Sequence, residues 1–437
     1  MEILVLGIGI VLLVVLIAKL HFNAFLSFIL VSLFIGLLDG MPAASVTVSL
    51  QKGVGDLLGS LVLILGFGAM LGKLIAESGA AQQIATGLLH AFGRKYLVWA
   101  LVLTAFIIGI PLFYGVGFVL VVPLVITLSY KYDIPAVYIG LPMLAALSVT
   151  HGYLPPHPSP TALITAYKAD MGTTLWYGFL IAVPAIVIAG PLFAITLKKY
   201  TAKPLAVFAA QPLPDDALPG MFNSIFTSFL PVLLIALASI VKLLVHHENV
   251  VSRVIIALGD PVIALLIAVL YAVCSLGLLH GKKIKDIMAS LADAVKQISM
   301  ILLIIGGAGG LKQVLTDSGT SDRITESLLA LHVHPLLAAW SISAIIRVAL
   351  GSSTVAGLTT AGVIAPLIVK SGVDPSLMVL ATGAGSLVFS HVNDPGFWMF
   401  KEYFNLSLKD TLKTWSVMET IVAVIGLIGV FIINRFL

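Results

Sequence analysis

Apolar runs separated by short polar breaks follow one another along the whole chain. A run of about 17–25 apolar residues is long enough to cross a lipid bilayer as a helix. The first half contains such runs at 3–20, 24–40, 57–77, 96–111, 115–130, 138–154 and 176–197. The second half contains them at 225–245, 254–279, 298–315, 336–350, 355–369, 377–391 and 415–433. This pattern predicts an all-α polytopic membrane protein.

Some of these runs are too short or too interrupted to span a bilayer unaided, namely 96–111, 138–154, 336–350 and 377–391. Backbone that is not helical survives at membrane depth only where protein or a water-filled cavity satisfies its polar groups. We therefore expect these runs to form broken helices and re-entrant hairpins.

The second half of the chain repeats motifs of the first half. The stretch 66–79 begins with Gly-Phe-Gly-Ala and ends with Glu-Ser-Gly, and the stretch 306–319 begins with Gly-Gly-Ala-Gly and ends with Asp-Ser-Gly. The same offset of 240 residues aligns Pro135 with Pro375 and His151 with His391. Internal duplication in an apolar chain is typical of secondary transporters, whose substrate sites lie between the two repeats.

The distribution of basic residues predicts that the two repeats have opposite orientations. The predicted loop 39–56 has one basic residue, Lys52, whereas the equivalent loop 280–296 has four lysines. After the third apolar run the bias reverses, because the first half has Arg94 and Lys95 there and the second half is mainly acidic. Basic loops stay in the cytoplasm. We therefore predict inverted-topology repeats at 1–199 and 222–437, a cytoplasmic linker at 200–221, and both termini outside.

Composition excludes several classes of protein. The chain has 437 residues, of which 59% are hydrophobic and 10% are charged. Soluble domains carry about 25% charged residues, so this composition requires a membrane. The single cysteine excludes an intrachain disulfide. The net charge of +4 comes from basic residues scattered at the ends of apolar runs, which indicates orientation signals and no nucleic-acid partner.

Two polar motifs at equivalent positions are candidates for substrate binding. The first is the proline-rich stretch 150–160, which we interpret as a rigid hairpin tip because proline disrupts helices. Its equivalent in the second half is 390–396. An ordinary surface loop, and a helix cap at Gly396 formed by Asp394, are the structural alternatives. The candidate binding residues in these motifs are Thr150, His151, His157, Ser159, Ser390, His391 and Asn393.

A third motif offers a positive charge inside an uncharged stretch. Arg347 lies between 336 and 369, and Ser352, Ser353 and Thr354 follow it at a helix break. A guanidinium binds a carboxylate with two parallel hydrogen bonds, and a helix N-terminus favours an anion. The alternative is a structural ion pair between Arg347 and Asp394. The matching stretch of the first half, 110–117, adds the hydroxyl of Tyr114 and an apolar wall.

Other chemistries find less support in the sequence. His151, His157 and His391 have no carboxylate or cysteine at ligand spacing beside them, so we expect no metal site. A membrane-embedded hydrolase needs a nucleophile and a base, and the adjacent Ser390 and His391 lack a separate orienting acid. We therefore expect a carrier and no enzyme. A channel stays open as an alternative, which saturable uptake driven by a gradient would exclude.

Several stretches of the chain resemble the gluconate permease family of bacterial proton symporters, within the ion-transporter superfamily. These stretches are 66–72, 113–123, 148–161, 304–319, 346–356 and 390–403. The resemblance implies uptake of gluconate or a related sugar acid across the bacterial inner membrane by proton symport; relatives that carry idonate or D-serine provide the alternative. It also implies elevator-like movement and a possible homodimer, with no cofactor beyond the coupling ion. Sodium is left open as an alternative coupling ion.

One position departs from the family pattern. Many gluconate permeases carry a glutamate where this chain has Gly115. A buried carboxyl is a natural proton carrier, so its absence leaves Asp394 and His151 as the candidate proton-coupling residues. We predict that Arg347 and the Ser352–Thr354 hydroxyls hold the substrate carboxylate, and that the histidine-containing motifs bind the sugar hydroxyls.

Overall fold

The computed structural model describes residues 2–204, 213–245, 249–320 and 333–437, together with Arg323 and Glu326. The described residues form helices and connecting segments without a strand, as the apolar pattern predicts. Nine helices in this part of the chain are long and apolar enough to cross a membrane, or up to ten if a bent pair counts as one span. The prediction of an all-α polytopic membrane protein is confirmed.

The helices of the first half are α1 (Glu2–Val14), α2 (Ala24–Leu38), α3 (Ala43–Glu77), α4 (Ala80–Phe92), α5 (Leu97–Gly109), α6 (Tyr114–Tyr132), α7 (Ala136–Tyr153), α8 (Pro158–Tyr167) and α9 (Met171–Val187). The second half contains α10 (Met221–Leu244), α11 (Val250–Leu258), α12 (Pro261–Ala272), α13 (Ile284–Asp317), α15 (Pro335–Leu350), α16 (Ser353–Ser371), α17 (Pro375–Gly385), α18 (Pro395–Tyr403), α19 (Leu408–Thr411) and α20 (Val417–Asn434). Wider π-helical turns extend α1, α9 and α12 at Val15–Lys19, Ile188–Leu192 and Val273–Gly277, and another at Leu412–Ser416 joins α19 to α20.

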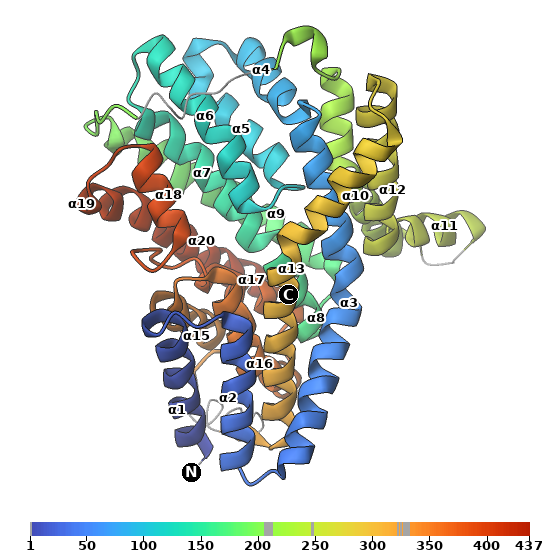
Figure 1. Ribbon diagram of the computed structural model, residues 1–437, viewed down its shortest axis with the longest axis vertical. Helices are drawn as coiled ribbons and strands as arrows, with labels where there is room; N and C mark the ends of the chain where they lie inside the picture. The colour runs from blue at the N-terminus through green and yellow to red at the C-terminus, as the bar shows by residue number, and fades with distance from the viewer. Residues whose placement is uncertain (1, 205–212, 246–248, 321–322, 324–325, 327–332) are drawn as a thin grey trace.

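The long helices α3 and α13 occupy equivalent positions in the two halves and lie side by side (Figure 1). They run antiparallel, because Ser49 near the start of α3 donates to Asp317 at the end of α13 (2.6 Å). Lys73 near the end of α3 pairs with Asp293 near the start of α13 (3.0 Å). An inverted repeat requires this antiparallel arrangement of equivalent helices. The repeat boundaries, the linker at 200–221 and the orientation in the membrane stay predictions.

The structure corrects the predicted loops on either side of the membrane. The stretches 39–56 and 280–296 were expected to be loops, yet α3 includes 43–56 and α13 includes 284–296. At about 1.5 Å per residue, the 35 residues of α3 span roughly 52 Å, which exceeds the apolar core of a bilayer. The polar ends stay helical because each long helix supplies ionic and hydrogen-bonding partners to the other.

Two further predictions need correction. The apolar run 254–279 is broken, because α11 ends at Leu258 and α12 begins at Pro261 after the Asp260 cap. The proline-rich stretch 150–160 is no hairpin tip, since α7 continues to Tyr153 and α8 begins at Pro158. Proline is well tolerated in the first helical turn, where its missing N–H has no partner to lose. Ala136–Tyr167 therefore has the character of one membrane span with a short break.

The prediction of short and broken helices is confirmed for the runs 96–111, 336–350 and 377–391. The pair formed by α4 and the helical stretch Arg94–Gly109 is bent by 114°. Helices α15 and α17 are apolar but have only 16 and 11 residues. After α17 the chain is not helical until Pro395, where α18 begins. These breaks bring polar residues from both halves to one place inside the protein.

Replacing Gly53 with alanine should destabilise the contact between α3 and α13. A Cβ atom at Gly53 would lie 2.2 Å from the carbonyl oxygen of Gly309 and 2.7 Å from Cβ of Gln313. Such overpacking costs about 1–3 kcal/mol, and we expect a lower midpoint of thermal unfolding in detergent. The matched control is Gly55→Ala on the same helix, where a Cβ atom would meet nothing within 4 Å. Equal midpoints for the two variants would contradict the close approach.

Candidate functional site

A cavity of about 310 Å³ lies where the broken helices meet. Its lining comes from α6, α7, α15, α16, α18, α20 and the segments that join them. The lining residues are Tyr114, Gly115, Ser148, His151, Arg347, Gly351, Ser352, Ser353, Thr354, Leu387, Asp394, Pro395, Gly396, Met399, Trp415 and Glu419. Both halves of the chain therefore contribute to one site, as expected when a substrate site lies between repeats.

Three helices begin at this cavity. Helix α6 begins at Tyr114, α16 begins at Ser353 and α18 begins at Pro395, and residues at all three starts line the cavity. The first N–H groups of a helix have no intrahelical partner, and the aligned peptide dipoles place partial positive charge there. The backbone thus makes the cavity favourable for an anion.

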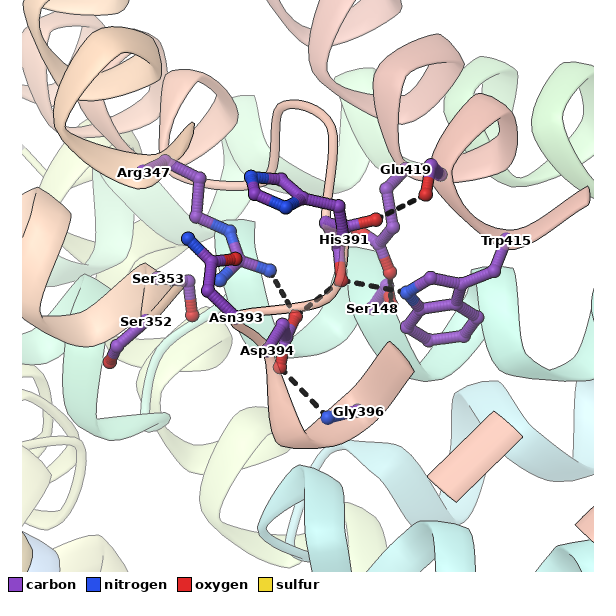
Figure 2. A network of polar contacts seen from close by, with 12 residues as sticks. Ser148, Arg347, Ser352, Ser353, His391, Asn393, Asp394, Gly396, Trp415 and Glu419 are labelled. Atoms are coloured by element: carbon purple, nitrogen blue, oxygen red, sulfur yellow. Dashed lines mark hydrogen bonds and ion pairs between the residues drawn. The ribbon is translucent and has the colours of Figure 1, made fainter. Parts of the chain in front are cut away.

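Arg347 is the one positively charged side chain among the lining residues of this cavity, and it is 4% exposed. Its guanidinium pairs with the carboxylate of Asp394, which is 15% exposed (Figure 2). The same carboxylate accepts a hydrogen bond from Ser390 and another from the backbone N–H of Gly396 (2.8 Å). The two structural alternatives considered for Asp394, an ion pair with Arg347 and a cap on the next helix, are both present.

The segment around Asp394 is held by hydrogen bonds to α15 and to the π-helical turn Leu412–Ser416. Asn393 Nδ2 donates to the carbonyl oxygen of Val348 (2.8 Å), and His391 Nε2 donates to the same oxygen (2.9 Å). Trp415 Nε1 donates to Ser390 Oγ (2.7 Å). These bonds hold Asp394, and through it the Arg347 guanidinium, in a defined position (Figure 2).

Several buried polar atoms at the cavity have no hydrogen-bond partner among the described residues. They are Tyr114 Oη, His151 Nδ1, Arg347 Nε and Glu419 Oε2. Nearly all buried polar groups in folded proteins are hydrogen-bonded, so each exception calls for an explanation. Their concentration at one cavity indicates donors and acceptors that a polar ligand would satisfy.

Seven predicted site residues line this cavity. They are Tyr114, His151, Arg347, Ser352, Ser353, Thr354 and Asp394. Within this group, Ser353 Oγ lies 3.4 Å from His151 Nε2, and the rings of Tyr114 and His151 are 5.9 Å apart. The helix break after Arg347 thus meets the end of α7.

The remaining predicted site residues lie behind the cavity wall or beside it. Thr150 donates to the carbonyl of Leu147 (2.9 Å), and His157 Nε2 donates to the carbonyl of Gly109 (2.6 Å). Ser159 is buried, and its Oγ has no partner in the described part of the chain. Ser390, His391 and Asn393 position Asp394 through the contacts described above. None of these six residues is among those that line the cavity.

Three polar lining residues were missed by the sequence analysis: Ser148, Trp415 and Glu419. Glu419 was detectable, because it is the one charged residue inside the apolar run 415–433. Ionisable residues within membrane spans are costly and are usually functional. Ser148 and Trp415 carried no comparable signal, since their role depends on which helices pack together.

The described residues contain no group of three or more His, Cys, Asp or Glu side chains that could hold a metal ion. The histidines near the cavity are instead held by protein groups or face its interior. His151 and His157 pack ring to ring at 5.4 Å, and His157 is bonded to the carbonyl of Gly109. The arrangement suits hydrogen bonding to an organic anion.

Comparison with known proteins identifies the family. The family model described as GntP family permease matches residues 1–436. The chain belongs to the GntP permease family. Because the family consists of permeases, this member is a transport protein, and the prediction of a transport protein and no enzyme is confirmed. With its membrane spans and its bacterial relatives, it is a multi-pass protein of the inner membrane.

Similarity to individual GntP relatives extends over their full lengths. The chain is 49% identical to the high-affinity gluconate transporter of Escherichia coli K12, over 99% of each chain. It is 46% identical to the Gnt-II system L-idonate transporter of the same organism, over 100% of each chain. It is 45% identical to the gluconate permease of Bacillus subtilis 168, over 98% of each chain.

Solved structures support the fold of this family member. The YdaH transporter of Alcanivorax borkumensis superposes with a TM-score of 0.67, covering 94% of this chain and 97% of that protein. MtrF of Neisseria gonorrhoeae superposes with a TM-score of 0.66, covering 93% and 94%. Sequence identities are only 16% and 13%. At such low identity, these two structural similarities support the fold and nothing further.

Proposed function

We propose that this protein imports gluconate, or a closely related sugar acid, by proton symport. The observation that carries the proposal is the set of groups lining one cavity: Arg347, whose Nε has no partner among the described residues, and the starts of three helices. A small monocarboxylate matches that set of donors. Full-length relatives at 45–49% identity are named gluconate transporters or permeases.

In this proposal the carboxylate of the substrate binds Arg347 and the start of α16, where Ser352, Ser353 and Thr354 line the cavity. The hydroxyls of the sugar acid bind Tyr114 and His151, whose Oη and Nδ1 atoms lack partners in the described part of the chain. Such a ligand satisfies buried polar atoms that are costly to leave unpaired. Asp394 holds Arg347 in place between transport cycles.

L-Idonate is a second candidate substrate. A relative named as an L-idonate transporter is 46% identical over the full length, and idonate is also a six-carbon sugar acid with one carboxylate. Competition by L-idonate and by D-serine against gluconate ranks these substrates.

Uptake of radiolabelled gluconate into proteoliposomes tests the proposed function. With an inward proton gradient, gluconate should accumulate above its external concentration, and a protonophore should abolish the accumulation. A parallel experiment with an inward sodium gradient and no proton gradient should give equilibration only. Absence of gluconate uptake by correctly inserted, folded protein would refute the substrate, and accumulation driven by sodium alone would refute the coupling ion.

Elevator-like movement and a homodimer, both implied by the family resemblance, stay predictions. The antiparallel pair α3 and α13 is a suitable static frame for such movement, since ionic and hydrogen-bonded contacts join its two ends.

A further inference from the structure

Glu419 is a buried acidic side chain that the proposed substrate contacts do not use. It lies in α20, is 2% exposed and lines the same cavity as Arg347. Its Oε1 accepts a hydrogen bond from Ser148 of α7 (2.5 Å), across 271 positions of the sequence. Its Oε2 has no partner among the described residues. Because Oε2 lines a cavity and accepts no hydrogen bond from the described residues, a proton can bind there without displacing another contact.

No cation is paired with Glu419 in the described part of the chain. The ionisable groups around it are Arg347 of α15, Asp394 before α18, Tyr114 of α6, and His151 and Tyr153 of α7. Arg347 is already paired with Asp394, so their charges largely offset each other at Glu419. The neighbouring helix α17 contains no ionisable residue, and the one in α9 is Tyr177. Within the described part of the chain, therefore, no positive charge is dedicated to this carboxyl.

The two carboxyl groups of the cavity differ in their surroundings. Asp394 Oδ2 bonds to Arg347 and Ser390, and Asp394 Oδ1 accepts from the N–H of Gly396 (2.8 Å). A proton on Asp394 would disrupt contacts that depend on its negative charge. A proton on Glu419 would displace no ion pair, because its Oε2 has no partner among the residues that the structure describes.

Protonation of Glu419 should favour binding of the substrate anion, for electrostatic reasons. An ionised carboxylate buried without a cation is costly, and a bound proton removes that cost. With Glu419 ionised, the three charged side chains of the cavity sum to one negative charge, and a substrate carboxylate would add a second. With Glu419 protonated, the same side chains are neutral overall. Binding of the proton and binding of the anion therefore favour each other, and this coupling is reciprocal.

We propose that Glu419 is the proton-binding residue of the transport site, and that it carries one proton for each sugar-acid anion. This inference rests on the proposed function. The proton enters the empty cavity from outside and binds Oε2 of Glu419, after which the anion binds Arg347. Both leave on the inner side, so one monovalent anion and one proton cross together with no net charge moved.

Proton uptake during substrate binding tests this inference directly. Purified protein in weak buffer with a pH-indicator dye is titrated with gluconate at neutral to alkaline pH. The wild-type protein should take up one proton for each gluconate bound, and its affinity should fall as the pH rises. Glu419→Gln resembles the protonated carboxyl in size and charge. It should bind gluconate with no proton uptake and no pH dependence, and in vesicles it should exchange gluconate without accumulating it.

Control variants separate this role from general effects. Glu402→Gln changes an exposed glutamate that pairs with Lys401, and it should take up protons as the wild type does. Asp394→Asn and His151→Gln remove the competing proton carriers, and any gluconate binding that remains should still be accompanied by proton uptake. Ser148→Ala removes the hydroxyl that donates to Glu419, so the pH midpoint of gluconate binding should move upward.

The outcomes distinguish this inference from the proposed function. Proton uptake by Glu419→Gln equal to that of the wild type would overturn the role of Glu419. If Glu419→Gln does not fold, an unchanged pH midpoint in Ser148→Ala would overturn it. Absence of gluconate binding by the wild-type protein would overturn the proposed function itself.

Discussion

Replacing Arg347 with lysine should weaken gluconate binding by about 100-fold, or roughly 2.7 kcal/mol, in the range measured for hydrogen bonds to charged groups. Lysine keeps a positive charge near Asp394, so the buried carboxylate retains a counter-ion. It loses the planar fork of donors, including the Nε–H that has no partner in the described part of the structure. Isothermal titration calorimetry of the purified variant measures the loss.

The same substitution at Arg435 is the matched control for Arg347→Lys. Arg435 follows the last residue of α20, is exposed and lies outside the cavity lining. Arg435→Lys should bind gluconate as the wild type does. Thermal unfolding of both variants checks that each is folded. Unchanged affinity in folded Arg347→Lys would show that the guanidinium does not hold the carboxylate.

Replacing Gly351 with alanine should abolish transport and lower stability. Gly351 ends α15 one turn after Arg347, with a φ of 76°, in the left-handed region that favours glycine. A Cβ atom there would lie 2.1 Å from the carbonyl oxygen of Asn393 and 2.7 Å from its Cγ. The backbone of the Asp394 segment would have to move, which would displace the partner of Arg347. We expect about 1–3 kcal/mol of overpacking in addition to the backbone strain.

Gly372 provides a control with the same backbone conformation. It ends α16 with a φ of 71°, and a Cβ atom there would meet nothing within 4 Å. Gly372→Ala therefore reports the left-handed strain alone, about 1–2 kcal/mol. The difference between the two variants in unfolding midpoint and in gluconate uptake measures the clash at Asn393. If Gly351→Ala transports as well as Gly372→Ala does, the tight approach is not required for function.

Much of the candidate site was predictable because its residues are unusual for their local context. Arg347 stands in a long uncharged stretch, and Ser352, Ser353 and Thr354 follow it at a helix break. Charged side chains and unpaired backbone groups cost free energy inside a membrane, so their presence there indicates a functional role. The histidine motifs were harder to assign. His151 reaches the cavity, whereas His157 bonds to a backbone carbonyl, and the local sequence does not distinguish the two.

Helix ends were less predictable than helix cores. The apolar run 57–77 predicted a span of ordinary length, but α3 begins at Ala43 and includes polar turns. Those turns are stabilised by α13, where Asp317 accepts from Ser49 and Asp293 pairs with Lys73. Hydropathy measures the cost of each residue in lipid and carries no information on partners 220 or more residues away.

The membrane location and the helical class of this chain could be read from its sequence, which also predicts an internal repeat and a cation, Arg347, inside an apolar stretch. These properties follow from run lengths, composition and motif spacing, which act locally along the chain. The tertiary structure was needed to show that Asp394 is bound to Arg347, and that Glu419 lines the same cavity with its Oε2 unpartnered among the described residues. Those facts depend on the packing of α7, α15 and α20, because electrostatic and hydrogen-bond interactions are set by distances between helices far apart in sequence.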